Sequence, residues 1–295
     1  MSYIITSETE LSRIAAPSLP LATREYSQQY IDQLNNVLRL YFNRLDNLLA
    51  QLNASGAPNF NGSGIQFPNG AFYQDGYTTL TANMTNNGTT PIQVTSTEGF
   101  VSSGGLIIGS ELITYTGKTS TTFTGITRGV YGSTNVAHTA GVSVSEAQTL
   151  ASATVSAPLT LLQTTVSNGV SIDPTDKTKI VHATAGIYNI QFSIQMLTFD
   201  GTIDNVTIWF RLNGVDIPYS AGIATVPAIH GGAPGTAIIS WNLVQPMNAG
   251  DYIQLLFAST TGNTVAATYP PGTSPVRPAS PSIIVTSTFV SALST

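Results

Sequence analysis

Apolar and polar residues alternate strictly through residues 188–196, and this pattern restricts the fold more than any other feature of the chain. In a strand, every second side chain faces the same side of the sheet. One face of this segment would carry Tyr188, Ile190, Phe192, Ile194 and Met196. Further strand-like segments are 206–212, 239–243, 253–257 and 283–289. Because no helical pattern separates them, we predict an antiparallel β-sandwich over residues 149–295.

A helical pattern occupies the N-terminal part of the chain, where apolar residues recur in alternating steps of three and four. This heptad seam consists of Ile31, Leu34, Leu38, Tyr41, Leu45, Leu48 and Leu52. The seam is widened by three further apolar residues, Val37, Phe42 and Leu49. They occupy positions where a two-stranded coiled coil usually has charged residues, so we expect three or more helices. We assign residues 21–56 to a trimeric coiled-coil stalk. The alternative is an amphipathic helix packed on its own domain.

The segments on either side of the predicted stalk are rich in turn and helix-breaking residues. Residues 1–20 mix apolar and polar side chains and end in two prolines, which predicts a docking peptide or, alternatively, a frayed terminus. Residues 57–77 contain several turn dipeptides and predict a linker or irregular collar. The dipeptides are Asn61-Gly62, Asn69-Gly70 and Asp75-Gly76.

The composition excludes several classes of function. Charged residues make up only 8% of the chain, the net charge is -5, and no basic run offers a surface for nucleic acid. The absence of cysteine excludes disulfides and thiolate sites. No secretion signal and no apolar run long enough for a bilayer is visible, so we expect no membrane insertion. We expect synthesis in a cytoplasm, with any surface location reached through assembly.

Residues 78–148 predict a small β-module of short strands separated by glycine turns. The module contains Ile108-Gly109-Ser110-Glu111-Leu112-Ile113-Thr114-Tyr115-Thr116-Gly117, then Thr124-Gly125-Ile126-Thr127-Arg128-Gly129, then Ala137-His138 near Gly141. Over about Gly99 to Val144 this resembles a β-module that recurs in virion proteins of tailed bacteriophages. The resemblance implies a structural role without catalysis. We expect Glu111, Arg128 and His138 to form an internal ion pair and hydrogen bonds rather than an active site.

The C-terminal part carries a second resemblance. Its residues are Gly186-Ile187-Tyr188, Trp209-Phe210-Arg211-Leu212-Asn213-Gly214, Leu243 with Asn248-Ala249-Gly250-Asp251-Tyr252, and Pro281-Ser282-Ile283-Ile284-Val285-Thr286. From about Leu159 to Val290 the chain is similar to the jelly roll of tumour necrosis factor and complement globular heads, in the version found at the C-termini of phage structural proteins. The resemblance implies a homotrimer with the sandwiches packed around a threefold axis, in agreement with the wide seam.

Two long loops interrupt the predicted sandwich, at 220–235 and 260–281, and loops of this kind often carry recognition. The candidate recognition residues in and beside them are Tyr219, His230, Tyr269 and Arg277. The alternative, which we favour, is that the loops line a subunit interface or fix the spacing of strands. Two exposed tyrosines are weak support for a glycan site.

No pattern predicts catalysis or metal binding. The three histidines lack metal-ligand spacing, and neither a phosphate loop nor a nucleophile elbow is present. A Ca²⁺ site around Asp200, Asp204 and Asn205 is the alternative to plain turn residues, which we favour. We therefore predict no catalytic residue, no cofactor and no metal.

We expect a homotrimeric fibre or decoration protein of a phage virion, assembled in the host cytoplasm and docked to other virion proteins through residues 1–20. The small module would form a neck and the sandwich a distal knob. One alternative is a receptor-binding protein that recognises a host glycan or surface protein. The other is a depolymerase of capsular polysaccharide or lipopolysaccharide.

Overall fold

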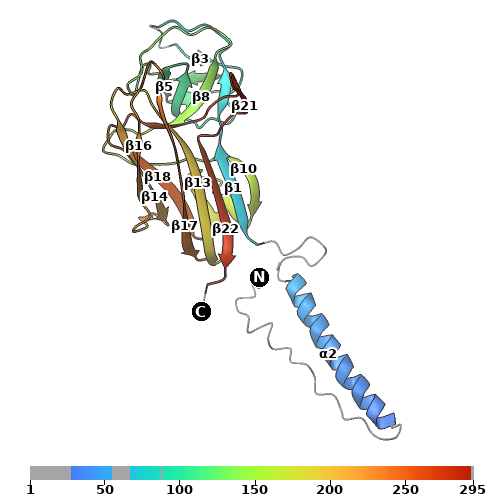
Figure 1. Ribbon diagram of the computed structural model, residues 1–295. Helices are drawn as coiled ribbons and strands as arrows, with labels where there is room; N and C mark the ends of the chain where they lie inside the picture. Colours follow the sequence, from blue (N-terminus) through green and yellow to red (C-terminus); the bar gives the residue numbers. More distant parts are fainter. Residues whose placement is uncertain (1–27, 55–66, 87, 89, 294–295) are drawn as a thin grey trace. The chain divides into compact units, whose positions relative to one another are not determined.

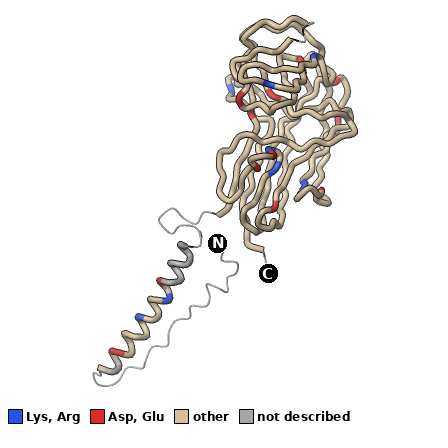
Figure 2. The backbone as a smooth tube through the Cα atoms, turned by 180° about the vertical axis from the view of Figure 1, so that it is seen from behind, with Lys and Arg blue, Asp and Glu red and all other residues tan. Residues whose placement is uncertain are grey.

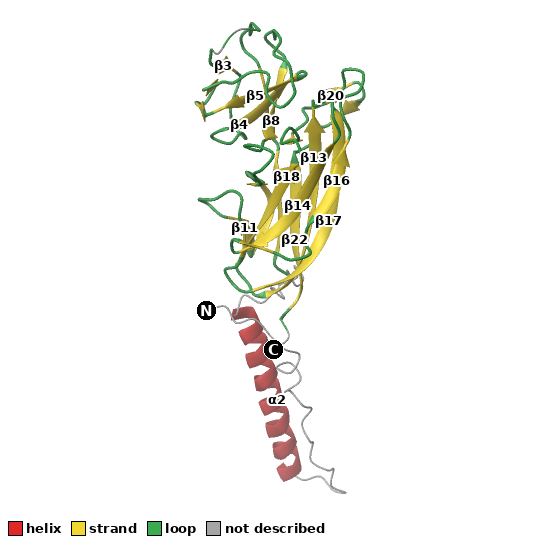
Figure 3. Ribbon diagram, turned by 90° about the vertical axis from the view of Figure 1, so that its left-hand side faces the viewer, coloured by secondary structure: helices red, strands yellow, loops and turns green. Residues whose placement is uncertain are grey.

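The computed structural model describes residues 28–54, 67–86, 88 and 90–293. The chain divides into a first unit, residues 1–67 with 291–295, and a second unit, Pro68–Val290. The first unit contains the helix α2, and the second is built from β-strands (Figure 1, Figure 3). The prediction of a mainly β protein with antiparallel sheets is therefore confirmed for the described residues.

Helix α2 spans Gln28–Ala54, inside the predicted interval 21–56. It contains neither glycine nor proline, and its leucines favour the helical state. Five seam residues are only partly exposed, namely Ile31, Leu34, Leu38, Tyr41 and Leu45. Leu48 and Leu52 belong to the helix, but their side chains lie outside the described part. The trimeric coiled coil stays a prediction.

Two other predictions concern parts of the chain that the structure does not describe. The docking peptide of residues 1–20 lies outside the described residues, and so do residues 57–66 of the predicted collar. Among the described residues, no helix has the length and apolar character that crossing a bilayer requires.

The second unit is organised by a ten-stranded antiparallel sheet. In spatial order its main path is β10 (Gln163–Asn168), β1 (Asn69–Gln74), β22 (Ile283–Ser291), β13 (Gly186–Thr198), β19 (Val265–Ala267), β8 (Ser143–Gln148), β4 (Gly104–Ile108) and β5 (Glu111–Tyr115). Strand β17 (Gly235–Met247) pairs with β13 along its whole length, and β2 (Tyr77–Thr79) pairs with β8.

A seven-stranded sheet packs against the first one. Its strands are β11 (Val170–Ile172), β12 (Ile180–His182), β18 (Tyr252–Ser259), β14 (Asp204–Leu212) and β15 (Val215–Asp216), with β16 (Gly222–Val226) on β14 and β9 (Ala157–Pro158) on β18. Two small sheets complete the unit. One pairs β20 (Gly272–Thr273) with β21 (Val276–Arg277), and the other has the order β3 (Ile92–Gln93), β7 (Thr122–Thr124) and β6 (Gly117–Lys118).

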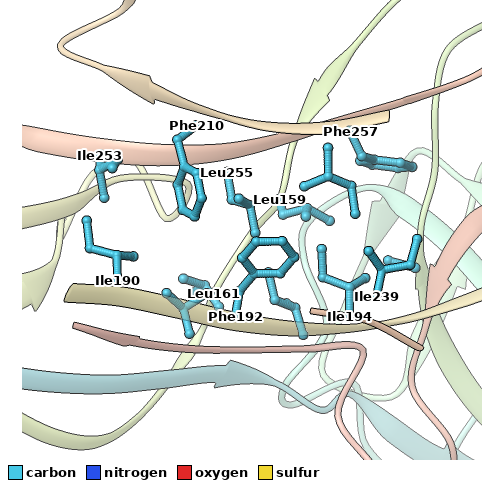
Figure 4. Close-up of a cluster of buried hydrophobic side chains, with 14 of the residues drawn as sticks. Leu159, Leu161, Ile190, Phe192, Ile194, Phe210, Ile239, Ile253, Leu255 and Phe257 are labelled. Carbon is cyan, nitrogen blue, oxygen red and sulfur yellow. The ribbon is translucent and has the colours of Figure 1, made fainter. Parts of the chain in front are cut away.

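One apolar core fills the space between the two large sheets (Figure 4). Ile190 and Phe192 of β13 project into it from one sheet, and Phe210 of β14 and Phe257 of β18 from the other. Phe192 and Phe210 meet edge to face, with ring centroids 5.5 Å apart. Each fully buried side chain of this size contributes roughly 1.5–3 kcal/mol. This shared core makes the second unit a β-sandwich, as the period-two alternation predicted.

Strand β1 lies inside the segment 57–77 that was predicted as a linker or irregular collar, and in its described part, from residue 67 on, this prediction is corrected. Asn69–Gln74 pairs with β10 from Asn69↔Asn168 to Tyr73↔Gln163, and with β22 at Gln74↔Ile283. Its side chains alternate between half-buried and buried, and Phe72 is fully buried in the sandwich core. The alternation outweighs the Asn69-Gly70 turn signal, because this dipeptide lies where the strand begins rather than inside a loop.

The module lies at the end of the sandwich away from the two ends of the second unit, and its role as a neck stays a prediction. Strand β1 carries the chain along the sandwich before the module begins, and Phe289 N donates to Pro68 O, so the two ends of the unit lie together. The module joins the opposite end, where β8 pairs with β19 and β19 pairs with the end of β13 at Met196 (Figure 3). Within the second unit, the module is therefore the part farthest from Pro68 and Val290.

No break in the fold corresponds to the predicted boundary between residues 148 and 149. The module has its own apolar cluster, which includes Tyr115 and Phe123. A further cluster joins it to the sandwich through Leu112, Leu197 and Phe199. Because β8, β19 and β13 belong to one sheet, the module and the sandwich share both a core and a hydrogen-bonded sheet.

Candidate functional site

The structure brings two of the four predicted recognition residues together. The guanidinium carbon of Arg277 lies 5.7 Å from the ring centroid of Tyr269. Arg277 Nη1 donates to the carbonyl oxygens of Pro270, at 3.0 Å, and Pro278, at 3.3 Å. Burial raises the pKa of Tyr269 above its ordinary value. Arg277 therefore holds its own proline-rich loop together.

His230, the third candidate, is exposed at the tip of a tight turn. The backbones of His230 and Ala233 exchange hydrogen bonds of 3.0 Å around Gly231 and Gly232, both of which have positive φ angles. Ile229 N donates to Asp200 O, at the connection between β13 and β14. The turn therefore lies at the same end of the sandwich as the module.

A cavity of about 350 Å³ lies beside Tyr269, at the junction of the module and the sandwich. Its walls include Ile107 and Val142 from the module, and Leu197 and Phe199 from the sandwich. None of its lining residues is charged. The cavity offers apolar packing area but no titratable pair of the kind that acid–base catalysis needs.

Tyr219, the fourth candidate, lies apart from the other three in the connection between β15 and β16. Its backbone has a φ of +63°, in the left-handed region that bulky residues rarely adopt, and its side chain is fully exposed. The next residue, Ser220, is buried. Its hydroxyl accepts from Phe210 N at 3.1 Å and donates to Ile217 O at 2.8 Å. The fold therefore holds the strained tyrosine in place.

A hollow of about 200 Å³ lies beside Tyr219, between the first residues of β16 and the middle of β17. Its lining residues are Tyr219, Ser220, Ala221, Gly222, Trp241, Asn242 and Leu243. Gly222 fits here because a Cβ atom would lie 2.7 Å from the Trp241 ring. The sequence did not point to Trp241 as a site residue, since the alternation places it on the core face of its strand with Ile239.

The predicted Glu111 cluster is a buried set of hydrogen bonds in the module. Arg128 binds both carboxylate oxygens, with Nε–Oε1 at 2.5 Å and Nη2–Oε2 at 2.6 Å. His138 Nε2 lies 2.8 Å from Oε2, and the backbone amides of Gly129 and Val136 donate to the carboxylate as well. The predicted internal ion pair is therefore confirmed. Its carboxylate is completely buried.

The residues considered for Ca²⁺ are bound to protein groups instead. The buried carboxylate of Asp204 accepts from the hydroxyls of Thr260, Thr261 and Thr264 at 2.7, 2.9 and 2.6 Å. Burial alone would raise the pKa of Asp204. The hydrogen bonds outweigh burial and lower this pKa to about 2. Asn263 Nδ2 donates to Asp200. In the part of the chain that the structure describes, no three His, Asp or Glu side chains gather as a metal site would require.

Two buried titratable groups were not predicted. Glu146 of β8 accepts hydrogen bonds from Gln74 Nε2 and, at 3.4 Å, from Val101 N. Burial nevertheless raises the pKa of Glu146 to about 7. His182 Nε2 lies 2.9 Å from Ser287 Oγ, both side chains are fully buried, and burial lowers the pKa of His182 to about 4. These groups join strands inside the unit and do not face solvent.

The described residues thus contain one strained, solvent-facing aromatic site, at Tyr219 and Trp241, and several buried polar clusters that hold the fold together. No model of a known protein family matches this sequence, and a search of curated proteins found no match.

Proposed function

We propose that this protein is a homotrimeric structural component of a phage virion, of the fibre or decoration type. The resemblance over Gly99–Val144 supports the virion role, since the residues that carry it form a buried structural cluster around Glu111. In this proposal the sandwich is a jelly roll of the tumour-necrosis-factor type, and residues 1–20 dock on other virion proteins. Within the second unit, the module and not the sandwich would be the part farthest from Pro68, where that unit begins.

One observation carries the proposal of self-assembly. Charged residues are sparse along the backbone of the second unit (Figure 2), and the neighbouring strands β10, β1, β22, β13 and β17 contain none. The face of these strands that points away from the core therefore carries only apolar and neutral polar side chains. Its residues on three of the strands are Asn189, Gln191, Ser193, Gln195, Ile238, Ser240, Asn242, Val244, Ile284, Thr286, Thr288 and Val290.

This face has the features of a surface that another copy of the chain covers. Ile238, Val244, Ile284 and Val290 are 68%, 55%, 43% and 57% exposed on it, and exposed aliphatic side chains that share one uncharged face are typical of surfaces that another protein covers. Strand β17 is also a long edge strand without the charges that normally protect such edges. The seven-stranded sheet differs, since Arg211 and Asp216 form an ion pair of 2.7 Å on it.

The helix fits the same assembly. Its seam residues are partly exposed, and a short helix of this kind needs a partner for its apolar stripe. A trimer of sandwiches would hold three helices at high local concentration, which favours their association without any further contact.

Sedimentation equilibrium of the full chain tests the proposal. We expect a trimer, and we expect Val244→Lys to shift the mass toward the monomer because three ammonium groups would lose water at the interface. Val276→Lys is the matched control, since Val276 is 88% exposed on the β20–β21 hairpin, outside the uncharged face. A monomeric wild-type chain, or equal effects of the two substitutions, would contradict the proposal.

A further inference from the structure

The backbone strain at Tyr219 stands out because it serves no internal packing. A non-glycine residue in the left-handed region is destabilising, and the fully exposed ring of Tyr219 recovers nothing from burial. The anchoring of Ser220 to Phe210 and Ile217 holds the loop in this conformation. Strain of this kind is typical of residues held in position for a ligand.

Trp241, on the other side of the hollow, has an unused hydrogen-bond donor. In the part of the chain that the structure describes, His182 Nδ1 is the one buried side-chain nitrogen or oxygen without a hydrogen-bond partner. The indole nitrogen of Trp241 forms no hydrogen bond there either, so it must contact solvent. Its ring is fixed by an edge-to-face contact with Phe192, with centroids 4.5 Å apart.

Two more neutral polar groups border the hollow. Asn242 Nδ2 donates to Asn189 Oδ1 at 3.0 Å. The side-chain oxygen of Asn242, Oδ1, accepts no hydrogen bond from the described residues. The Tyr219 hydroxyl has no hydrogen-bond partner among them. The residues that line the hollow therefore include an aromatic ring and three polar groups without a partner among the described residues, namely an N–H donor, an amide oxygen and a hydroxyl, and none of these residues is charged.

We infer that the hollow formed by Tyr219, Trp241 and Asn242 is a binding site for one ring of a neutral saccharide. A pyranose offers an apolar C–H face to an aromatic ring and hydroxyl groups to donors and acceptors at its edge. Acidic sugars and phosphates are disfavoured, because binding them calls for a cationic partner. At about 200 Å³ the hollow is smaller than pockets for drug-sized ligands and suits a single ring.

A second copy of the chain is the competing occupant, since Asn242 also lies on the uncharged face of β17. The unused polar groups favour the saccharide, because a subunit contact would bury them and leave them unpaired at a cost in free energy. Because Asn242 belongs to both surfaces, the inference requires that the subunit contact leave the hollow open, and the two proposals are tested by separate measurements, of sugar binding and of mass.

Tryptophan fluorescence of the full chain tests the inference. The chain has two tryptophans, and Trp209 donates instead to Asp216, so Trp209→Phe leaves Trp241 as the reporter. The probes are the methyl glycosides of galactose, glucose and N-acetylglucosamine. We expect a saturable change in Trp241 emission with at least one probe, with a Kd on the order of 1 mM for so few ligand atoms.

Substitution of Tyr219 decides the assignment. In the same background, Tyr219→Ala should weaken binding at least about tenfold, a loss of about 1.4 kcal/mol. Tyr77→Ala is the matched control, because Tyr77 is an exposed tyrosine of β2 that does not line the hollow, and this variant should bind normally. The absence of saturation with every probe, unchanged binding by Tyr219→Ala, or tighter binding of N-acetylneuraminic acid would overturn the inference. A loss of trimer in Tyr219→Ala would assign the tyrosine to a subunit contact.

Discussion

At the scale of single residues, Glu111 connects three parts of the module. Its carboxylate accepts from Arg128, from His138 and from the backbone at Gly129 and Val136. Burial would raise the pKa of Glu111, but the hydrogen bonds from Arg128 and His138 hold it below its ordinary value. The residues that carry the resemblance to the phage module thus meet at one buried carboxylate, although His138 follows Glu111 by 27 positions in the sequence.

We expect Glu111→Gln to lower the free energy of unfolding by about 3–5 kcal/mol, because it leaves the buried guanidinium of Arg128 without a counter-charge. Urea denaturation followed by circular dichroism measures this change. Glu98→Gln, at an exposed position, is the control and should stay within about 0.5 kcal/mol of the wild type. A loss below about 1 kcal/mol for Glu111→Gln would show that the ion pair does not stabilise the fold.

Glu146 and His182 should make stability depend on pH in opposite directions. Burial raises the pKa of Glu146 from 4.5 to about 7, so its contribution is present below pH 4.5 and is lost as the pH rises toward 7. Burial lowers the pKa of His182 from 6.5 to about 4, so its contribution is present above pH 6.5 and is lost as the pH falls toward 4. Between these limits the two effects offset each other in the wild type.

Single substitutions should separate the two effects. In Glu146→Gln, the free energy of unfolding should fall as the pH drops from about 6.5 to 4.5, whereas that of the wild type changes little. The reason is that no effect of Glu146 then opposes the effect of His182. In His182→Asn, the free energy of unfolding should rise as the pH drops over the same range. Its absolute value is lower than in the wild type at every pH, because the contact with Ser287 is lost. Urea midpoints at several pH values measure both slopes. Slopes of the same sign in the two variants would contradict the assignment.

At the scale of elements, the periodicity of α2 predicts which leucines matter for association. Leu38 lies on the heptad seam, whereas Leu40 lies off it and is 58% exposed. We expect Leu38→Asp to reduce the helical signal and the trimer mass, since a buried seam cannot accommodate an unpaired carboxylate. Leu40→Asp is the matched control and should change neither. Equal losses in both variants, measured by circular dichroism and sedimentation, would contradict the seam.

Strand β1 shows the limit of prediction at this scale. Its short alternation, Gly70, Phe72 and Gln74 on one side and Ala71 and Tyr73 on the other, is no longer than many loops contain by chance. What makes it a strand is its pairing with β10 and β22, roughly ninety and more than two hundred residues later in the chain. A local pattern carries no information about such distant partners.

At the scale of the whole second unit, the continuous sheet predicts that the module and the sandwich unfold together. Phe123 is fully buried in the module cluster, and both tryptophans belong to strands of the sandwich. Phe123→Ala should therefore lower the urea midpoint reported by tryptophan fluorescence, with a cost of about 3–5 kcal/mol. Val136→Ala, at an exposed position in the module, should leave it unchanged. If the urea midpoint of tryptophan fluorescence is the same in Phe123→Ala as in the wild type, the module and the sandwich unfold independently.

The sequence by itself determined the properties that depend on close neighbours along the chain. Alternation around Tyr188–Met196 identified β13, the heptad steps identified α2, and the phrases around Glu111 indicated its ion pair with Arg128. Secondary structure and periodic burial follow from local sequence, because a strand or helix repeats its geometry every few residues.

Only the tertiary structure decided where these elements lie. The position of the module at the far end of the sandwich follows from the pairing of β1, and the hollow exists because Trp241 lies against Gly222. The burial that shifts the pKa of Glu146 and of His182 likewise depends on strands distant in sequence. Sheet order, register and packing between sheets are long-range contacts, and no spacing within one segment encodes them.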